Sequence, residues 1–551
     1  MTVRLYGHHP GDRIRCRPAG PRGPVRRRAA RLAAFLSVIL ISMPPTRAAA
    51  PQRGLTGAAR IAPAYDAILD GRFGDLPTVL RHACQRGPAA AVDLAPAEAC
   101  DVIEVVGLWW QIQLDPWSTE RDARFQSRVD AVIAATDAWT VREPDRAEAW
   151  FYRGAAYGAR VQWRVLRSEQ LAAARDGKRI KDALERALAL DPQLHDAWFG
   201  IGLYHYYADV APTAAKMLRW LLFLPGGNRV QGMQEMLRAR DSGALMRGEA
   251  DYQLHVLYLW YEKQPQRALE LLRGLQTRHP SNPHFLQLIA EVQDTYLHDF
   301  TGSLRSWQTL IEEARGGRLT NAPMALTRAR LGAALQLDRL FESDVAVEHL
   351  RAVIQSTPTA PYGAAAEAQL QLGRALDRLG DRAGATAAYR AAIATAPPGD
   401  PLKVGAAARA GLRDAPRPTP AEAYRLSIEG WRALQRGQLA EASRALDRSL
   451  ALQPQDAVTQ YRRARLLLAR RDAPGALSLL ETIARTRATT PPTIYALACA
   501  DAAHLHEQRG ERTRAIELYR TAQDVFGADE RTKDDARRAI ARLTKEEEGR
   551  R

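Results

Sequence analysis

The segment HLHEQRG, residues 504–510, brings two histidines and a glutamate close together. The zinc protease motif H-E-x-x-H needs a second histidine four positions after the first, so that both rings lie on one helix face. Here Gly510 stands where that second histidine would follow His506. His504 is two residues from His506, which places the two rings on different faces of a helix. The segment therefore predicts neither a metal site nor zinc chemistry.

Other motifs that carry enzyme chemistry are also missing from the sequence. The segment GIG, residues 200–202, lacks the preceding strand and the third glycine of a dinucleotide-binding loop. Neither the nucleophile elbow G-x-S-x-G nor the phosphate loop G-x-x-x-x-G-K-[ST] occurs, and no C-x-x-C pair is present. We therefore expect a non-enzymatic protein with no cofactor and no catalytic residue.

The segment WFGIGLYHYY, residues 198–207, gathers aromatic side chains that could bind a partner. Trp198, Ile201 and His205 are three and four residues apart, so they share one helix face and are expected to pack internally. Tyr206 and Tyr207 lie on or beside a second face, and aromatic side chains with a polar tip suit interfaces. These two tyrosines either contact a partner or are covered by the helices that follow.

Two stretches of the chain share one pattern of small and large residues, which indicates how the chain is organised. In residues 372–398 the pattern consists of Gly373, Leu376, Gly380, Ala385, Tyr389, Ala392 and Pro397. In residues 429–454 it consists of Gly430, Ala433, Gly437, Ala442, Leu446, Ser449 and Pro454. Small residues allow two helices to approach closely, larger residues fill the gap between them, and the proline ends the second helix. The spacing predicts paired antiparallel helices.

This pattern resembles the tetratricopeptide repeat, W-x2-L-G-x2-Y…A-x3-F-x2-A-x4-P, a helix–turn–helix unit of about 34 residues. Further copies occur at residues 149–157, 179–192, 197–205, 266–280, 346–358, 464–483 and 506–522. Each unit leaves an apolar face uncovered, so several units must stack. The resemblance covers most of residues 145–525. It implies an all-α superhelical solenoid of tetratricopeptide-type repeats, of the exported bacterial type.

The chain departs from the repeat spacing in two places. Tyr157 and Ile180 are 23 residues apart, whereas the repeat has about nine, and the excess corresponds to about two extra turns on each of two helices. We therefore expect a lengthened hairpin around residues 158–179. The second departure is an insertion at residues 208–243, where prolines and glycines divide the segment. There we expect an inserted helical pair, 213–224 and 229–241.

The resemblance also implies which residues face the concave groove of the solenoid. Carried over repeat by repeat, these positions include Arg374, Tyr424, Trp431, Tyr461 and Arg465. Trp431 is not one of the packing positions of the repeat, so it is either an exposed anchor or packs on the linker beside it. Because binding hot spots favour Trp, Tyr and Arg, we expect aromatic anchors and carboxylate-binding arginines that contact a protein or peptide partner.

An alternative function depends on the apolar helix predicted over residues 213–224. Its segment KMLRWLLFL carries two cations and a tryptophan, and it is too short to cross a membrane. On this interpretation a lipid surface is contacted by Met217, Trp220, Leu221 and Leu224. Residues 210–260 also show a local resemblance to the eukaryotic tetratricopeptide-repeat protein 39 family, which is linked to lipid and inclusion handling. The other interpretation is a buried inserted helix.

Most of the excess positive charge lies in the first fifty residues. The chain carries a net charge of +16, and residues 1–50 contain ten arginines and one aspartate, which leaves 16 − 9 = +7 for the remainder. Such a mixed surface argues against a nucleic-acid partner. The basic residues 26–28, the apolar run LAAFLSVILI and the small residues after it form a secretory pattern. We expect export to the periplasm or cell envelope. No cysteine directly follows the apolar run, so no lipid anchor is expected.

Cys84 and Cys100 lie close together in the sequence, with fifteen residues between them. In an exported protein they are the natural disulfide pair. In a cytosolic protein two buried thiols on neighbouring helices would be expected instead.

These patterns divide the chain into six parts. We expect a leader with signal peptide (1–50), an N-terminal helical cap with the possible disulfide (51–145), a first repeat block (146–413), a Pro-rich linker (414–422), a second repeat block (423–530), and a capping helix with a polar tail (531–551). The expected function is a protein–protein interaction scaffold of the cell envelope that binds a peptide or protein segment in its concave groove.

Overall fold

The computed structural model describes residues 54–84, 94–210 and 226–548, and within these residues it contains helices and no strands. Four helices precede the repeats: α1 (Ala58–Leu69), α2 (Leu76–Ala83), α3 (Ala97–Leu114) and α4 (Asp122–Arg142). Their large side chains Trp110, Phe125 and Trp139 are fully buried. Cys84, directly after α2, is joined to Cys100 of α3 by a disulfide, with the two Cα atoms 6.1 Å apart.

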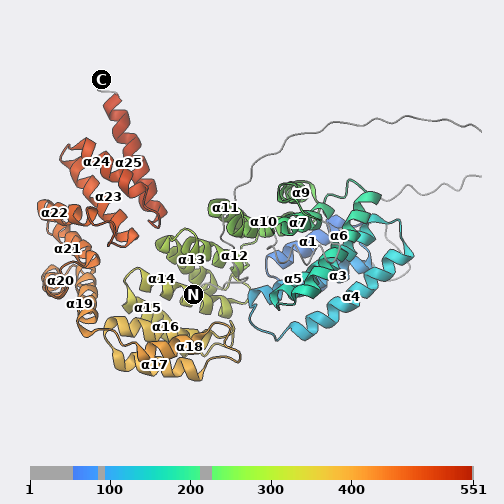
Figure 1. Ribbon diagram of the computed structural model, residues 1–551, viewed down its shortest axis with the longest axis horizontal. Coiled ribbons are helices and arrows are strands. Elements are labelled where there is room, and N and C mark those ends of the chain that lie inside the picture. The colour runs from blue at the N-terminus through green and yellow to red at the C-terminus, as the bar shows by residue number, and fades with distance from the viewer. Residues whose placement is uncertain (1–53, 85–93, 211–225, 549–551) are drawn as a thin grey trace, which may run out of the picture.

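Paired helices make up most of the rest of the described chain. The pairs are α5 (Ala147–Leu166) with α6 (Gln170–Leu190), α7 (Ala197–Val210) with α9 (Arg229–Ser242), α10 (Arg247–Trp260) with α11 (Pro265–Arg278), α12 (Pro283–Thr295) with α13 (Phe300–Arg315), α14 (Ala322–Arg339) with α15 (Ser343–Gln355), α16 (Ala364–Leu379) with α17 (Arg382–Ala394), α19 (Pro418–Gln435) with α20 (Leu439–Leu452), α21 (Ala457–Ala469) with α22 (Ala473–Ala484), and α23 (Pro492–Gln508) with α24 (Arg512–Gln523). The single helix α18 (Val404–Arg413) follows α17, and α25 (Glu530–Glu548) covers the last pair. The fold is an all-α superhelical solenoid, as expected (Figure 1).

The repeated small residues act as the sequence pattern predicts. A Cβ atom at Gly373 of α16 would lie 2.5 Å from the Tyr389 ring of α17, and one at Gly430 of α19 would lie 2.6 Å from Leu446 of α20. Real Cβ contacts are not this short, so a larger residue at either glycine would push the paired helices apart. The pairs therefore pack closely because a small residue in the first helix faces a large one in the second.

The long hairpin predicted around residues 158–179 is present in the α5–α6 pair. α5 has 20 residues and α6 has 21, whereas α16 and α17 have 16 and 13. The extra turns of each helix lie against the other, so the insertion extends the pair without interrupting it.

The segment after α7 is arranged differently from the predicted inserted pair. The helix expected at 229–241 is α9, but it packs directly on α7, because a Cβ atom at Gly202 would lie 2.7 Å from the Gly232 carbonyl oxygen. α9 is thus the second helix of the α7 repeat and is not an insertion. The helix expected at 213–224, together with Met217, Trp220, Leu221 and Leu224, lies outside the described residues.

The Pro-rich linker predicted at 414–422 is shorter than expected. α18 ends at Arg413 and α19 begins at Pro418, so residues 418–422 are helical. Proline is tolerated in the first turn of a helix because the N–H group it lacks has no partner there. The prolines that suggested a linker instead start a helix.

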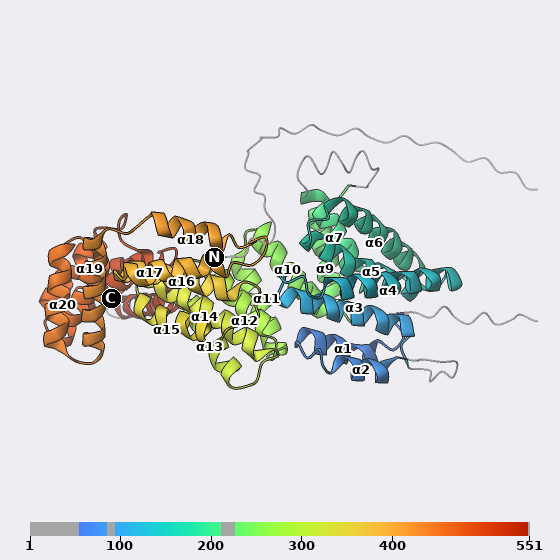
Figure 2. The same cartoon turned by 90° about the horizontal axis from the view of Figure 1, so that it is seen from below.

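The repeats curve so strongly that the C-terminal helices return to the middle of the chain. In Figure 1 the helices α19 to α25 continue the curve of α14 to α18, and α23 to α25 turn back toward α13; Figure 2 shows α19 and α20 beyond α16 to α18. An ion pair of 2.7 Å between Arg305 of α13 and Asp529, just before α25, joins the two regions. In the part of the chain that the structure describes, no helix combines the length and the apolar composition needed to cross a membrane.

Candidate functional site

The predicted groove residue Tyr424 contacts the chain itself. Its hydroxyl lies 2.8 Å from the hydroxyl of Ser343, the first residue of α15, and the guanidinium of Arg378 lies 5.9 Å from its ring centre. Tyr424 is half-buried by these contacts. The α14–α15 turn (residues 340–342) therefore lies against α19, where a ligand was expected.

The α14–α15 turn is held by two arginines of the second repeat block. Arg462 of α21 is buried and donates hydrogen bonds to the Phe341 carbonyl oxygen at 2.6 Å and to the Ser427 hydroxyl at 2.9 Å. Arg432 of α19 forms an ion pair with Glu342 at 3.1 Å and another with Asp344 at 2.7 Å. These contacts hold the chain's own turn beside Tyr424, at one of the predicted groove positions.

Trp431 is half-buried, and the Arg462 guanidinium lies 5.9 Å from its ring centre. Trp431 is therefore not a freely exposed anchor, and its ring contacts an arginine of α21. The Trp431 ring therefore lies beside Arg462, the cation that holds the α14–α15 turn. A tryptophan face over a guanidinium is a favourable arrangement.

Tyr461 and Arg465 share one acidic partner on α23. The Tyr461 hydroxyl donates to Asp501 at 3.0 Å, and Arg465 forms an ion pair with the same carboxylate at 3.3 Å. Tyr461 is buried, so the prediction that it contacts a partner is wrong. Burial and the Asp501 carboxylate both raise the pKa of Tyr461. Arg374 of α16 and Arg465 remain exposed, as a partner-binding role requires.

Tyr206 of α7 is fully buried, which rules out the predicted partner contact. Its hydroxyl donates to Glu262 at 2.6 Å, and its ring centre lies 5.7 Å from that of Tyr261. Burial and the Glu262 carboxylate raise the pKa of Tyr206. The half-buried Tyr207 packs edge-on against Tyr206 with ring centres 6.0 Å apart. These tyrosines are part of the packing between α7 and α10.

An open cavity of about 590 Å³ lies where the two repeat blocks face each other, and we call it the interblock cavity. Its walls come from the ends of α12 and α14, from the turns that follow them, from α16 and from the residue before α23. The lining residues are Asp294, Thr295, His298, Phe300, Arg339, Phe341, Arg378 and Pro491. Two phenyl rings, two guanidinium groups and an imidazole thus surround one space.

The two arginines of the interblock cavity are positioned by acidic neighbours. Arg339 is paired with Asp294, and its guanidinium lies 5.0 Å from the Phe300 ring centre. Arg378 donates to the Asp338 carbonyl oxygen at 2.8 Å and forms an ion pair with the Asp338 carboxylate at 3.3 Å. A guanidinium has five N–H donors, so each arginine retains donors for a ligand acceptor. This arrangement can bind a carboxylate beside an apolar group.

Two cavity residues occupy a turn position that has positive φ in several repeats, filled by glycine in some turns and by residues such as Ser168, Lys263 and Arg471 in others. Gly380, Gly437 and Gly510 have φ of 85°, 76° and 78° in the turns after α16, α19 and α23. At the same position His298 has φ 54° and Phe341 has φ 64°. A bulky residue in this left-handed region is strained. Since Ser168, Lys263 and Arg471 share the position outside the cavity, the strain alone does not distinguish the cavity residues. Neither residue was identified from the sequence, because the contacts that bring them to the cavity join distant parts of the chain.

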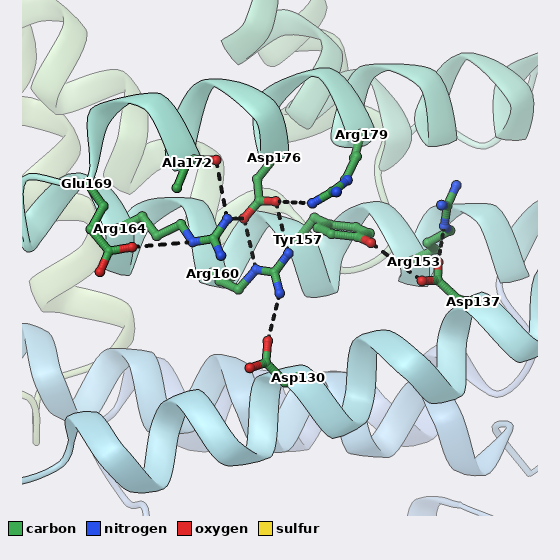
Figure 3. Close-up of polar contacts among 10 residues, drawn as sticks. All are labelled: Asp130, Asp137, Arg153, Tyr157, Arg160, Arg164, Glu169, Ala172, Asp176 and Arg179. Atoms are coloured by element: carbon green, nitrogen blue, oxygen red, sulfur yellow. Dashed lines mark hydrogen bonds and ion pairs between the residues drawn. The ribbon is translucent and has the colours of Figure 1, made fainter.

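A second charged cluster lies between α4, α5 and α6, but its charges are paired with each other (Figure 3). Asp176 is fully buried and accepts from Arg160, Arg164 and Arg179 at 2.6 to 2.9 Å. Arg160 also pairs with Asp130 at 2.7 Å. This network fastens the lengthened hairpin. Among the described residues, no group of three or more His, Cys, Asp or Glu side chains is arranged to hold a metal ion.

Comparisons with known proteins match two parts of the chain to a family model. Residues 366–398 and residues 429–490 each match a model of the tetratricopeptide repeat. No curated protein matched the chain. Among solved structures, the chain is similar to a tetratricopeptide repeat protein from Parabacteroides merdae, with 15% identity, 54% of this chain and 98% of that chain covered, and a TM-score of 0.24. It is also similar to a Rap protein complexed with competence and sporulation factor, with 13% identity, 88% and 99% covered, and a TM-score of 0.30.

Proposed function

We propose that this tetratricopeptide repeat protein is a non-enzymatic scaffold that binds a segment of a protein partner in the interblock cavity. Tetratricopeptide repeats are typical of protein–protein interaction scaffolds. The cavity volume of about 590 Å³ is within the range of ligand-binding pockets, about 300–1,000 Å³. The observation that carries the proposal is that Phe341, His298, Arg339 and Arg378 meet around one space.

The chemistry of the interblock cavity indicates the kind of segment it binds. Arg378 and Arg339 can each donate to a carboxylate from an acidic side chain or a chain terminus. The rings of Phe300 and Phe341 offer apolar surface beside those donors. We therefore propose a segment that presents a carboxylate next to an apolar side chain. This site replaces the groove surface around Tyr424 and Tyr461, which the chain's own turn and helices cover.

Substitutions in the interblock cavity test the proposal with a library of free peptides that carry acidic and apolar residues. We expect Arg378→Gln to weaken the best selected peptide at least about tenfold, because a charge-assisted hydrogen bond contributes about 1.5–3 kcal/mol. Phe341→Gly is expected to weaken binding of the same peptide by a similar factor. The turn should be kept, because glycine adopts a positive φ readily. Fluorescence polarisation measures both affinities.

Arg471→Gly is the matched control for Phe341→Gly. Arg471 has φ 64°, occupies the same turn position after α21 and is exposed. The substitution Arg471→Gly therefore relieves the same backbone strain without changing the interblock cavity. This variant should bind the selected peptide with the affinity of the wild type. Unchanged affinity in both cavity variants would show that the peptides bind elsewhere.

We also propose that the chain is exported to the periplasm or cell envelope. Two features support this: the secretory pattern in the first fifty residues and the disulfide between Cys84 and Cys100. Disulfides persist in oxidising compartments and are rare in a reducing cytosol. Cell fractionation of the native host tests the location; recovery in the cytosol with both thiols reduced would refute it.

Removing the disulfide should weaken the N-terminal cap. The bond links residues 16 positions apart, and closing a loop of this size stabilises by about 2–3 kcal/mol in the chain-entropy model. We expect Cys84→Ser with Cys100→Ser to lower the free energy of unfolding of α1 to α4 by this amount. Hydrogen exchange of α1 to α3 peptides, in oxidised and reduced wild type and in the variant, measures the loss. Equal protection in all three samples would contradict it.

A further inference from the structure

The α24–α25 loop (residues 524–529) contacts the α12–α13 turn (residues 296–299) and Arg305 of α13, although more than 220 residues separate them. The Arg305 guanidinium donates to the Asp529 carboxylate at 2.7 Å. The ring centres of His298 and Phe526 lie 5.1 Å apart, and a Cβ atom at Gly527 would lie 3.3 Å from the His298 Cβ. In a solenoid, repeats ordinarily contact their neighbours in sequence. This contact therefore closes the superhelix on itself.

The contact is small and partly exposed to water. Phe526 keeps 62% of its surface exposed although it packs on His298. The Arg305 side chain is 46% exposed and the Asp529 side chain is 11% exposed, so their ion pair is partly open to water and weakens in salt. The main-chain N–H of Glu530 adds one hydrogen bond, to the buried Asp299 carboxylate. A contact of this kind can break without unfolding the repeats on either side.

The contact also borders the interblock cavity. His298 contacts Phe526 and at the same time lines the cavity together with Phe300 and Pro491. Pro491 precedes α23 and His298 follows α12, so the cavity is lined by residues from both regions that the contact joins. If the α24–α25 loop moves away, the wall at His298 loses its neighbour.

We propose that the α24–α25 loop and the α12–α13 turn form a latch that opens and closes the superhelix beside the interblock cavity. The ion pair between Arg305 and Asp529 holds the latch closed. The consequence for ligand entry rests on the proposed function of the cavity. The opening itself does not, and it can be measured without a ligand.

Distance measurements between two spin labels test the latch in the full chain. Labels at Gln308→Cys of α13 and Asp535→Cys of α25 lie on exposed positions on either side of the contact. We expect one short distance in the otherwise unchanged protein at low salt. A second, longer distance should appear with Arg305→Glu and with Asp529→Arg, and the charge swap that combines both should restore the short one. High salt should lengthen the distance without any further substitution.

The control is Arg514→Glu, which breaks the ion pair of 3.0 Å to Glu517 within α24 and leaves the latch intact. Its distances should match those of the starting protein. A single unchanged distance in Arg305→Glu at low and high salt would overturn the latch. So would a charge swap that stays open, because the proposal assigns closure to this pair.

Ligand entry is measured separately with the peptide selected for the interblock cavity. We expect Arg305→Glu to raise the association rate at least threefold, and the charge swap to return it to the wild-type value. A longer label distance with an unchanged association rate would refute the role of the latch in entry and leave its opening established. Loss of peptide binding in Arg378→Gln, measured in the same assay, shows whether the cavity is the site.

Discussion

Replacing Asp176 with asparagine is expected to destabilise the N-terminal repeats by about 3–5 kcal/mol. Removing one member of a buried, hydrogen-bonded ion group leaves its partners uncompensated, and such changes cost about this much. Asparagine has nearly the same shape, so the loss would come from charge and hydrogen bonding and not from a cavity. This is the largest effect of a single substitution that we predict for the described residues.

The geometry around Asp176 explains the magnitude. The carboxylate is fully buried between α5 and α6, and Figure 3 shows three guanidinium groups converging on it. Arg160 donates two hydrogen bonds of 2.9 Å, and Arg164 donates one of 2.6 Å. Their side chains are only 12% and 21% exposed, so water cannot replace the lost acceptor fully. An asparagine amide would also direct N–H donors toward these cations.

The matched control is Asp130→Asn on α4. Asp130 pairs with the same Arg160 at 2.7 Å, but its side chain is 64% exposed. A surface ion pair contributes about 0–1 kcal/mol, so this variant should lose no more than that. Because repeats unfold in units that contact their neighbours, hydrogen exchange of α4 to α6 peptides is the appropriate measurement. Similar losses of stability in Asp176→Asn and Asp130→Asn would show that burial of the carboxylate does not determine the size of the destabilisation.

The fold was largely predictable because its determinants are local. The close approach of Gly373 to Tyr389 and of Gly430 to Leu446 follows from short spacings between small and large residues that repeat along the sequence. The lengthened α5–α6 pair could be predicted because Tyr157 and Ile180 are further apart in the sequence than the repeat requires. Asp176 was not identified, because its partners are known only once the register of α5 against α6 is known. The repeat pattern marks packing positions and does not mark charges placed between helices.

The site was not predictable because it depends on curvature. Groove positions can be carried over repeat by repeat only if each repeat follows the previous one regularly. Here α18 and the helix start at Pro418 change the path, and the α14–α15 turn comes to lie against Tyr424 and Arg462. Phe341 and His298 thereby become neighbours of residues far along the chain. Contacts of this range leave no periodic signal in one sequence.

Glu249 should make the stability of the protein depend on pH. Its carboxyl group, on α10, is 4% exposed and accepts a hydrogen bond of 3.2 Å from the Trp110 indole of α3. Burial raises the pKa of Glu249 from 4.5 to about 7, and the hydrogen bonds from Trp110, Gln253 and Tyr65 oppose that rise in part. Between these two pH values the folded protein holds a proton that the unfolded chain has released.

The sign of the effect follows from this difference. Below about pH 4.5 both states carry the proton, and the contribution of Glu249 to stability is complete. It is lost as pH rises through about 7, and the loss amounts to about 3 kcal/mol at about 1.4 kcal/mol per pH unit. The buried His255 and His284 act in the opposite direction, because burial lowers their pKa values to about 4 and about 3. They remove stability as pH falls below 6.5.

Comparing Glu249→Gln with the wild type isolates the effect of the Glu249 carboxyl group on stability, because both proteins retain His255 and His284. Glutamine cannot ionise, and its carbonyl oxygen can still accept from Trp110. We expect the variant to gain about 2.5 kcal/mol relative to the wild type between pH 5 and pH 8, measured by denaturant unfolding at both values. Glu270→Gln on α11, which is exposed, should shift stability equally at the two pH values. A parallel pH profile for Glu249→Gln and the wild type would mean that Glu249 ionises in the folded protein as readily as in water.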